Sequence, residues 1–337
     1  MIKIVLFDER SCDLIPGIIN NKSFLDLPIW GNYRFRAFVN HIISLYADFG
    51  IEVSIAEWEG REKIADIMKN TNSKGIFISR VSSLVFSELE YFEKIEDGPV
   101  KLSINKIPTD FYYLPKNYFF DEFLKDLTHI KTIQDLFGRY LFERFVKMAD
   151  RNGYSFLMRD GYEYYRENIK TLDYLKNNEI LSIIGNLLSL SEVEAYIGGN
   201  VKASYVAPGS KILGNVLDSV IFEGVEIGEG SHIESSVILP GNKIEEDVII
   251  KNSLILEGVS RFIGRGSRIG DFYDAQRSIN HDINHSYHLK NGLTIVGEGV
   301  NIPEGSRIGA FCVIWGKGNP EKRVELNDGE YLFIDSD

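Results

Sequence analysis

The feature that most constrains this chain is an aliphatic side chain that returns every six residues in its C-terminal third. The positions with this spacing are Ile221, Ile227 and Ile233; then, after a one-residue slip, Ile238, Ile244, Ile250, Leu256 and Phe262; and finally Val296, Ile302, Ile308 and Ile314. Glycine and small polar residues separate them. A fixed hexapeptide period predicts a parallel β-helix, in which each hexapeptide forms one flat face, the aliphatic side chain points inward and three faces close a coil.

The N-terminal half alternates apolar runs of strand length with amphipathic segments of helix length. We expect strands over 2–7, 51–56, 75–79 and 154–157, two strands within 101–113 separated by Pro108, and helices over 33–49, 61–70, 119–127, 132–150 and 172–190. Gly50 would end the first helix as its C-cap. The order of strands and helices predicts a mostly parallel sheet covered by helices.

A length of 337 residues suggests two domains. We predict an α/β domain over 1–190 and a β-helix domain over 191–337, with the repeat running from about Val201 to about Trp315. The polar segment 271–291 interrupts the repeat and predicts an inserted loop. The charged tail, 317–337, is expected to cap the open end of the solenoid.

Composition excludes several classes of partner. The net charge of −12 argues against nucleic acid and anionic membranes, because phosphate groups attract Lys and Arg. The two cysteines, Cys12 and Cys312, lie far apart and do not suggest a disulfide framework. A signal peptide and an apolar run of about 20 residues are both missing from the sequence. These observations indicate a cytoplasmic protein.

Three stretches carry a resemblance to a known family. Residues 28–38 read PIWGNYRFRAF, similar to P-F-G-G-K-Y-R-I-I-D-F, and residues 166–172 read RENIKTL, similar to W-x-D-[IV]-G-T. Residues 201–257 look like the start of a hexapeptide β-helix. In this order they resemble the ADP-glucose pyrophosphorylases. The resemblance implies a nucleotidyltransferase-like N-terminal domain with a Rossmann-type sheet and a left-handed β-helix.

The chain departs from that family where the family binds the nucleotide triphosphate. The motif G-G-x-G-x-R-L-x-P-L-T follows the first strand in the family, whereas residues 7–18 read FDERSCDLIPGI here. Asp8 and Glu9 replace glycines, so their carboxylates are expected to repel phosphates. Asp13 replaces the arginine that would offset charge in the transition state, and Arg10 remains as the nearby cation.

The positions that would bind Mg²⁺ are also changed. Arg80 and Val81 stand where the family has Gly and Asp, and Asn168 replaces the aspartate of the W-x-D motif. Mg²⁺ prefers anionic oxygen ligands, and without it little neutralises the developing charge of phosphoryl transfer. We therefore predict no cofactor, with Mg²⁺ only if the chain is active. Rescue of the metal site by a neighbouring carboxylate, Asp8 or Glu167, stays open.

Several residues of the family segments persist. Gly31, Tyr33, Arg34 and Thr171 are candidates for residual ligand binding, with packing at the start of a helix as the alternative role. Lys22 lies two residues from the position at which the family has a lysine.

Histidines provide the remaining candidates. His281, His285 and His288 would share one face of a helix, as a metal site needs, but neither a cysteine nor a clear glutamate completes the set, which favours a solvated loop. His232, expected at a corner of the repeat, together with His281 or His285 raises the alternative of a hexapeptide acyltransferase, which would use a loop histidine as general base.

The hypothesis with most support is a non-catalytic, regulatory ADP-glucose pyrophosphorylase-like subunit of glycogen synthesis. It would form a homo-oligomer or a hetero-oligomer with a catalytic paralogue and bind a sugar phosphate or nucleotide-sugar effector. A divergent but active sugar-1-phosphate nucleotidyltransferase is the main alternative. The aromatic segment 111–124 is expected to be core, with a subunit contact as the other possibility.

Overall fold

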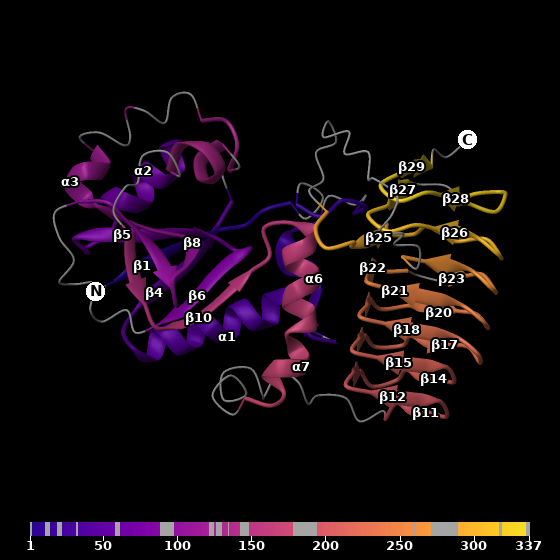
Figure 1. Ribbon diagram of the computed structural model, residues 1–337. Coiled ribbons are helices and arrows are strands. Elements are labelled where there is room, and N and C mark those ends of the chain that lie inside the picture. Colours follow the sequence, from indigo (N-terminus) through magenta and orange to yellow (C-terminus); the bar gives the residue numbers. More distant parts are fainter. Residues whose placement is uncertain are drawn as a thin grey trace. The chain divides into compact units, whose positions relative to one another are not determined.

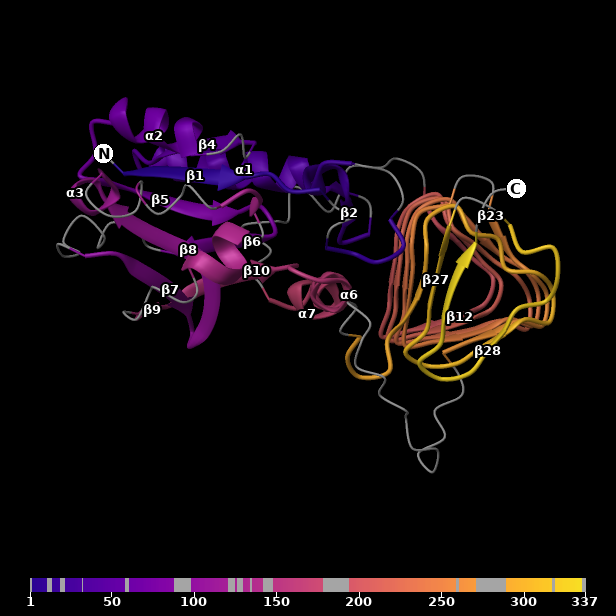
Figure 2. The ribbon, with the colours of Figure 1, turned by 90° about the horizontal axis from the view of Figure 1, so that it is seen from above.

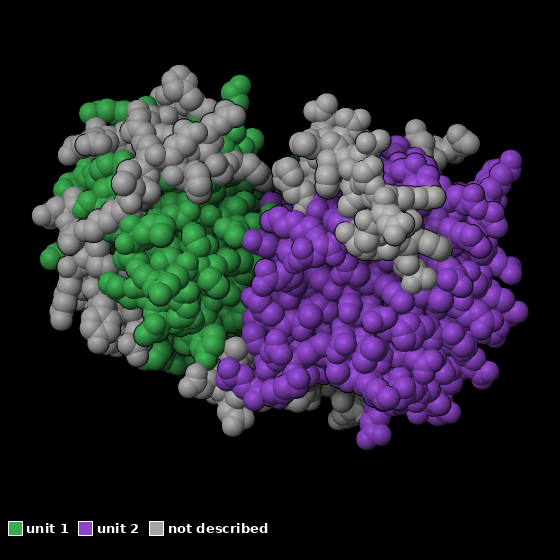
Figure 3. Space-filling view, in the orientation of Figure 1, with its two compact units in different colours: residues 1–10, 23–26, 36–159 green, residues 11–22, 27–35, 160–337 purple. Residues whose placement is uncertain are grey.

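A computed structural model describes residues 2–10, 14–18, 22–31, 33–57, 61–87, 98–120, 125, 130–133, 135–141, 148–177, 194–258, 261–270, 289–316 and 319–334. The chain forms two compact units (Figure 3). Unit 1 comprises residues 1–10, 23–26 and 36–159, and unit 2 comprises residues 11–22, 27–35 and 160–337. The predicted boundary near residue 190 and most of the predicted loop 271–291 lie outside the described residues.

Unit 1 is built on a six-stranded sheet. Its strands, in spatial order, are β4 (Glu52–Ala56), β1 (Lys3–Phe7), β5 (Gly75–Arg80), β8 (Ile107–Pro115), β7 (Val100–Ile104) and β9 (Met148–Arg151). The expected parallel pairing holds for β4, β1 and β5, whereas β8 runs antiparallel to both of its neighbours and makes the sheet mixed. A separate antiparallel pair joins β6 (Ser83–Ser87) to β10 (Gly153–Leu157).

Helices lie on both faces of this sheet. Figure 1 shows α1 (Phe35–Asp48) on the opposite side of the sheet from α2 (Arg61–Lys69) and the short α3 (Lys116–Tyr118). Short helical turns occur at η2 (Phe24–Asp26) and η6 (Asp135–Tyr140). Gly50 follows α1 with φ of 71°, as expected of a C-cap glycine. The aromatic segment is core wherever it is described: Phe111, Tyr112, Tyr113 and Phe119 are all buried.

Three predictions about unit 1 need correction. The turn between β7 and β8 is at Asn105 and Lys106, both with positive φ, and not at Pro108, because a two-residue hairpin requires left-handed backbone at those two positions. The predicted helix over 132–150 is wrong at its end, where β9 pairs with β7. The first helix begins at Phe35, since Tyr33 and Arg34 pair with β2 instead.

Unit 2 contains the parallel β-helix, which confirms the prediction from the six-residue period. Its strands stack into three sheets, seen end-on in Figure 2. The first sheet contains β11 (Tyr196–Ile197), β14 (Lys211–Ile212), β17 (Glu226–Ile227), β20 (Asn242–Ile244) and β23 (Arg261–Ile263). The second contains β12 (Asn200–Lys202), β15 (Asn215–Leu217), β18 (His232–Glu234), β21 (Ile249–Lys251), β24 (Arg268–Ile269), β26 (Arg307–Ile308) and β28 (Glu325–Leu326). The third contains β13 (Tyr205–Val206), β16 (Val220–Ile221), β19 (Val237–Ile238), β22 (Ser253–Ile255), β25 (Thr294–Val296), β27 (Val313–Gly316) and β29 (Tyr331–Ile334).

The inward-facing residues follow the predicted period with one exception. Most of the predicted aliphatic residues, from Ile221 to Ile314, join one buried core. Leu256 and Phe262 are not part of that core, and Phe262 is 40 % exposed. Ile255 and Ile263 take their places. The step from Ile250 in β21 to Ile255 in β22 is one residue shorter than the period, as it is from Ile233 to Ile238, and the longer corner between β22 and β23 then brings Ile263 inward.

The solenoid extends further than predicted at both ends. Its first described strand is β11, which lies before Val201. The tail that we expected to act as a cap adds β28 to the second sheet and β29 to the third. None of the helices in the described ranges is long and apolar enough to cross a membrane.

The outer face of the third sheet is apolar and covered within unit 2. Its outward residues Val220, Val237, Leu254 and Ile295 are fully buried. The described residues of unit 2 outside the coils include α6 (Gly161–Ile169), α7 (Thr171–Tyr174) and the short pair β2 (Pro28–Ile29) and β3 (Tyr33–Arg34). The Gly161 backbone approaches Ile295, and the hydroxyl of Tyr165 in α6 donates to the carbonyl of Ser235. Two of the segments that carry the family resemblance therefore pack in the same unit as the β-helix.

Candidate functional site

The carboxyl ends of β1 and β5 form the natural place for a ligand in unit 1. β1 lies between β4 and β5 and runs parallel to both, so the chain goes first to one side of β1 and then to the other. In open α/β sheets, ligands bind outside the carboxyl ends of strands at such a switch point. Asp8 and Glu9 follow β1 directly, and Arg80 is the last residue of β5.

Arg80 ties this edge together through a buried ion network. Its Nη1 lies 3.1 Å from Glu9 Oε1, and its Nε lies 3.0 Å from Asp110 Oδ2. Ser82 donates to the second carboxylate oxygen of Glu9. The side chains of Arg80, Glu9 and Asp110 are only 10 %, 0 % and 8 % exposed. The chain's own side chains therefore satisfy one another at the edge where a ligand would bind.

The charges of this network depend on one another. Burial acts to lower the pKa of Arg80, but the Glu9 and Asp110 carboxylates outweigh it and raise that pKa above its ordinary value. Burial also raises the pKa of the Glu9 carboxyl, against the effect of Arg80. Removing one partner from such a network leaves an unpaired buried charge, which is far more costly than losing an exposed pair.

The network corrects the expectation that Glu9 repels phosphates as a free carboxylate, because its charge is internally paired. Asp8 is also engaged: it accepts hydrogen bonds from Ser23 Oγ at 2.5 Å and from the Glu9 backbone N–H at 2.9 Å. Burial raises the pKa of Asp8. Arg10 is exposed and pairs through its backbone with Ser23, and Asp13 lies outside the described residues.

In unit 2, Asn168 acts as a buried connector. Its Oδ1 accepts from the Trp30 backbone N–H at 2.9 Å, and its Nδ2 donates to the Tyr164 carbonyl at 2.9 Å. Thr171 Oγ1 donates to the Asn168 carbonyl at 2.6 Å. Asn168 and Thr171 are both 0 % exposed. Both the oxygen and the nitrogen of the Asn168 amide are thus engaged, and the amide joins the start of the β2–β3 turn to α6.

Gly31 is fixed by close packing against the β-helix. A Cβ atom at this position would lie 2.0 Å from Cε1 of Tyr205, and the φ of Gly31 is +99°. Both observations require glycine and support packing over ligand binding as the role of Gly31. Of the other candidates in this turn, Tyr33 and Arg34 are described only as the backbone of β3.

Glu167 is a fully buried carboxylate beside Asn168. It accepts from Tyr174 OH at 2.5 Å and lies 2.9 Å from Lys170 Nζ. Burial raises its pKa. Both of its oxygens are therefore engaged in holding α6 and α7 together, which argues against its service as a substitute metal ligand.

Lys22 has a partner that the sequence did not suggest. Its Nζ lies 3.1 Å from Glu257 Oε2 and forms a second short pair with Glu298 Oε1. Burial acts to lower the pKa of Lys22, but hydrogen bonds to these carboxylates raise it. The Glu298 backbone N–H also donates to the Gly17 carbonyl at 2.8 Å. The segment around Gly17 and Lys22 is thus attached to the β-helix within unit 2.

Comparison with known proteins identifies the relatives of this chain. The GlmU-like C-terminal hexapeptide family model matches residues 191–296. A glucose-1-phosphate adenylyltransferase of Desulfitobacterium hafniense (strain Y51) is 29 % identical over 227 residues, covering 64 % of this chain and 53 % of that protein. The same enzyme of Acetivibrio thermocellus is 37 % identical over 121 residues, 35 % of this chain and 27 % of that protein. The chain is thus similar in sequence to glucose-1-phosphate adenylyltransferases. It spans about half the length, or less, of the curated relatives that it matches.

The residues present do not fit the Mg²⁺ ion that the resemblance to ADP-glucose pyrophosphorylases implies. Val81 is buried and apolar, and Asn168 is neutral with both ends of its amide engaged. Among the described residues there is also no group of three His, Cys, Asp or Glu side chains that could hold a metal ion.

The histidine candidates have separate outcomes. His281, His285 and His288 lie outside the described residues. His232 was expected at a corner of the repeat, but this expectation is wrong, because His232 lies within β18. Its Nε2 lies 3.3 Å from Glu234 Oε2. It faces outward, since the neighbouring Ile233 occupies the inward position.

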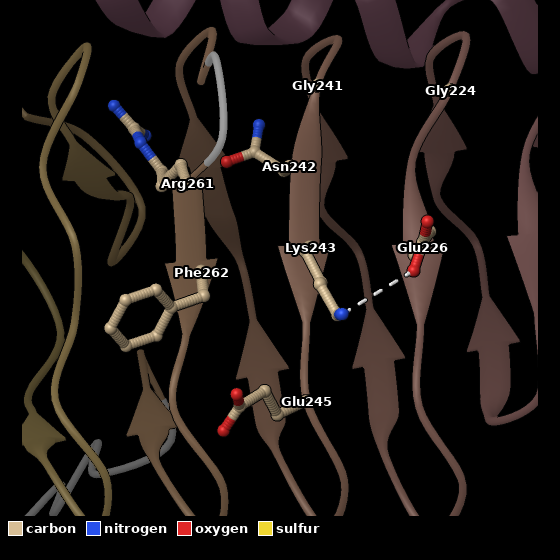
Figure 4. Close-up of a pocket in the computed structure, with 8 residues that line it drawn as sticks. All are labelled: Gly224, Glu226, Gly241, Asn242, Lys243, Glu245, Arg261 and Phe262. Atoms are coloured by element: carbon tan, nitrogen blue, oxygen red, sulfur yellow. Dashed lines mark ion pairs between the residues drawn. The ribbon is translucent and has the colours of Figure 1, made fainter.

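A hollow of about 350 Å³ lies on the outer face of the first β-helix sheet (Figure 4). Glu226 and Lys243 lie 4.0 Å apart in it and are both more than half exposed, so this pair contributes little. The Arg261 guanidinium is instead bound to backbone carbonyls of Leu256 and Gly297. The hollow thus presents no converging set of catalytic groups.

Sequence reasoning missed two partners of the network, Ser82 and Asp110. The signal was present in the sequence, because Arg80 ends an apolar strand and a buried guanidinium needs a carboxylate. It also missed α6, which the sequence marks with Asp160 as N-cap: the carboxylate accepts from the Glu163 N–H at 2.7 Å.

Proposed function

We propose that this chain is a non-catalytic, ADP-glucose pyrophosphorylase-like subunit that regulates a catalytic paralogue of glycogen synthesis. The observation that carries the proposal is the buried Arg80–Glu9–Asp110 network at the carboxyl ends of β1 and β5. A triphosphate at this edge would find the Arg80 guanidinium already bound to two carboxylates and would have to displace it from them.

The engaged amide of Asn168 supports the same proposal. Phosphoryl transfer depends almost entirely on positioning and on neutralising the charge that spreads over the transferred group. Neither Asn168 nor Val81 can supply an anionic ligand to a magnesium ion, and Arg80 is bound by Glu9 and Asp110. The described residues thus lack the groups that this chemistry needs.

The test is an assay of pyrophosphorolysis with ADP-glucose, pyrophosphate and Mg²⁺. The Desulfitobacterium hafniense enzyme, assayed in parallel, is the positive control. We expect no turnover by the chain alone. Turnover at an ordinary enzymatic rate, on the order of 1 s⁻¹ or more, would instead support a divergent active nucleotidyltransferase.

A second experiment addresses the regulatory role. The chain would be co-expressed with a motif-intact paralogue from the same genome, and the complex purified through a tag on this chain alone. We expect the paralogue to co-purify and its response to sugar phosphates to change relative to the paralogue by itself. Independent elution of the two proteins, with unchanged kinetics on mixing, would contradict a regulatory subunit.

A further inference from the structure

The outer face of the first β-helix sheet carries one column of side chains whose charges alternate. In register, from β11 to β23, the column consists of Tyr196, Lys211, Glu226, Lys243 and Phe262. In β14, β17, β20 and β23, the residue that follows each of them belongs to the buried core, so the column itself points outward. The two ends of the column are thus aromatic, and its middle is positive, negative and positive in turn.

The side chains of this column are exposed and only weakly paired within the chain. Tyr196 is 62 % exposed and Phe262 is 40 % exposed. Glu226 and Lys243 lie 4.0 Å apart, but more than half of each side chain is exposed, so this pair contributes little. Lys211 is exposed and, within the part of the chain that the structure describes, forms no ion pair. Aromatic side chains are enriched in protein–protein interfaces, which makes this face a candidate contact surface.

The charges of the column are complementary to those of a second copy. A two-fold axis that lies between two such faces and runs along the strands reverses the order of the column, so that the two copies face each other end for end. With the axis midway between β14 and β17, Lys211 of each copy faces Glu226 of the other, and Lys243 faces Tyr196. With the axis on β17, Glu226 would face itself and Lys211 would face Lys243, and such like-charge contacts are unfavourable. Charge therefore favours the first register.

The same register offers a place for the Tyr196 side chain of the second copy. The hollow of about 350 Å³ on this face is lined by Glu226, Lys243 and Phe262, among others (Figure 4). Tyr196 of the second copy would lie over Lys243, and Phe262 would be its neighbour, because adjacent strands are only about 4.8 Å apart. An aromatic ring at that place can contact the ammonium group with its face and another ring with its edge.

We propose that the outer face of the first β-helix sheet is the contact surface between two copies of this chain. Each copy inserts its Tyr196 into the hollow of the other, and two Lys211–Glu226 ion pairs form across the two-fold axis. Five strands span only about 20 Å, so the contact is smaller than a standard interface and its Kd is expected on the order of micromolar. The contact lies on the β-helix and does not depend on whether unit 1 is catalytic.

The test is an exchange of charges, followed by analytical ultracentrifugation of the full chain from micromolar to submillimolar concentration. We expect reversible self-association of the wild-type chain. Lys211→Glu should weaken it by about tenfold or more, because like charges then face each other, and Glu226→Lys should do the same. The double variant with both substitutions should recover most of the association, because the opposite charges face each other again.

The matched control is Lys202→Glu, which makes the same change of charge at an exposed lysine of β12, on the second sheet. It should change the dissociation constant less than twofold, and Tyr196→Ala should weaken association as Lys211→Glu does. Circular dichroism establishes that each variant is folded.

Three results would overturn the proposal: a wild-type chain that stays monomeric over this range, equal effects of Lys211→Glu and Lys202→Glu, or a double variant that associates no better than the single ones. Self-association that Lys211→Glu leaves unchanged would place the contact on another face and would overturn it as well. Each of these results leaves the proposed loss of catalysis untouched. Turnover in the pyrophosphorolysis assay, conversely, would leave this contact standing.

Discussion

Arg80 Nη1 lies 3.1 Å from Glu9 Oε1 at the carboxyl ends of β1 and β5. Both residues stand where the ADP-glucose pyrophosphorylase resemblance places glycines, and Glu9 without Arg80 would be a buried carboxylate without its cation. Together they neutralise each other, with Asp110 as the third member. The departures from the family pattern are therefore structurally coupled and not a set of independent losses.

Arg80→Met is expected to destabilise unit 1 by about 3–5 kcal/mol, because it leaves the Glu9 carboxylate buried without a cation and removes one of the cations beside Asp110. Arg36→Met is the matched control, since Arg36 and Asp26 form an ion pair that is about half exposed, and it should cost less than about 1 kcal/mol. Urea denaturation of the full chain measures both. Adding Glu9→Gln to Arg80→Met should recover part of the lost stability, because it removes the unpaired carboxylate. Equal losses of stability in Arg80→Met and Arg36→Met would contradict a buried network.

Gly31→Ala is expected to destabilise unit 2 more than an alanine at another glycine with positive φ. The new Cβ would lie 2.0 Å from Tyr205 Cε1, so overpacking of about 1–3 kcal/mol adds to backbone strain of about 1–2 kcal/mol. Gly299→Ala is the control: its φ is +76° and the space around it is open, so it carries the strain alone. Thermal unfolding compares the two. In a Tyr205→Ala background, Gly31→Ala should cost less stability than in the wild-type protein, because the side chain that it would meet is gone. Equal losses in the two backgrounds would argue against this contact.

Glu167→Gln is expected to change how stability depends on pH. Burial raises the pKa of Glu167 in the folded chain above its ordinary value of 4.5, so the folded state holds this proton more tightly than the unfolded state. The contribution of Glu167 to stability is therefore present at low pH and is lost as pH rises through the folded pKa. Relative to the variant, the wild-type protein should lose unfolding free energy as pH increases above 4.5.

The measurement is urea unfolding of wild type and variant at several pH values between 5 and 8. Glu226→Gln removes a carboxylate that is 56 % exposed in the same unit and should leave the wild-type slope unchanged. Parallel curves for wild type and Glu167→Gln would mean that this carboxylate does not carry the expected linkage.

Ile263→Ala is expected to cost about 2–5 kcal/mol, as for other large-to-small changes in a core. Phe262→Ala, one residue away, should cost less than about 1 kcal/mol, because Phe262 is 40 % exposed on the outer face of β23. Chemical denaturation of the two variants distinguishes them directly. A larger loss of unfolding free energy for Phe262→Ala than for Ile263→Ala would instead support Phe262 as the inward residue, as the six-residue count predicted.

The one register error shows what periodicity can and cannot specify. The spacing from Ile221 to Ile250 identified inward positions correctly, because each hexapeptide forms one face of a coil. The count failed at Leu256, because the step from Ile250 to the inward Ile255 is one residue shorter than the period, and at Phe262, because a longer corner precedes β23. A regular period carries no information about extra residues in a corner.

The candidate site was less accessible to sequence reasoning than the fold. The sequence located Glu9, Arg80 and Asn168 as departures from a family pattern, but it did not reveal what each side chain binds. Glu9 and Arg80 are 71 residues apart, and Trp30 and Asn168 are 138 apart. Such partners depend on how sheets and helices pack, which no local pattern encodes.

By itself, the sequence determined the β-helix and the parallel strands β4, β1 and β5, since a repeating inward side chain and buried apolar runs are local properties of the chain. Only the tertiary structure decided that Arg80 neutralises Glu9, that Gly31 packs on Tyr205, and that Lys22 joins Glu257 and Glu298. The physical reason is that a buried charge or a missing Cβ acquires its role from residues distant in the chain, which become neighbours only in the folded protein.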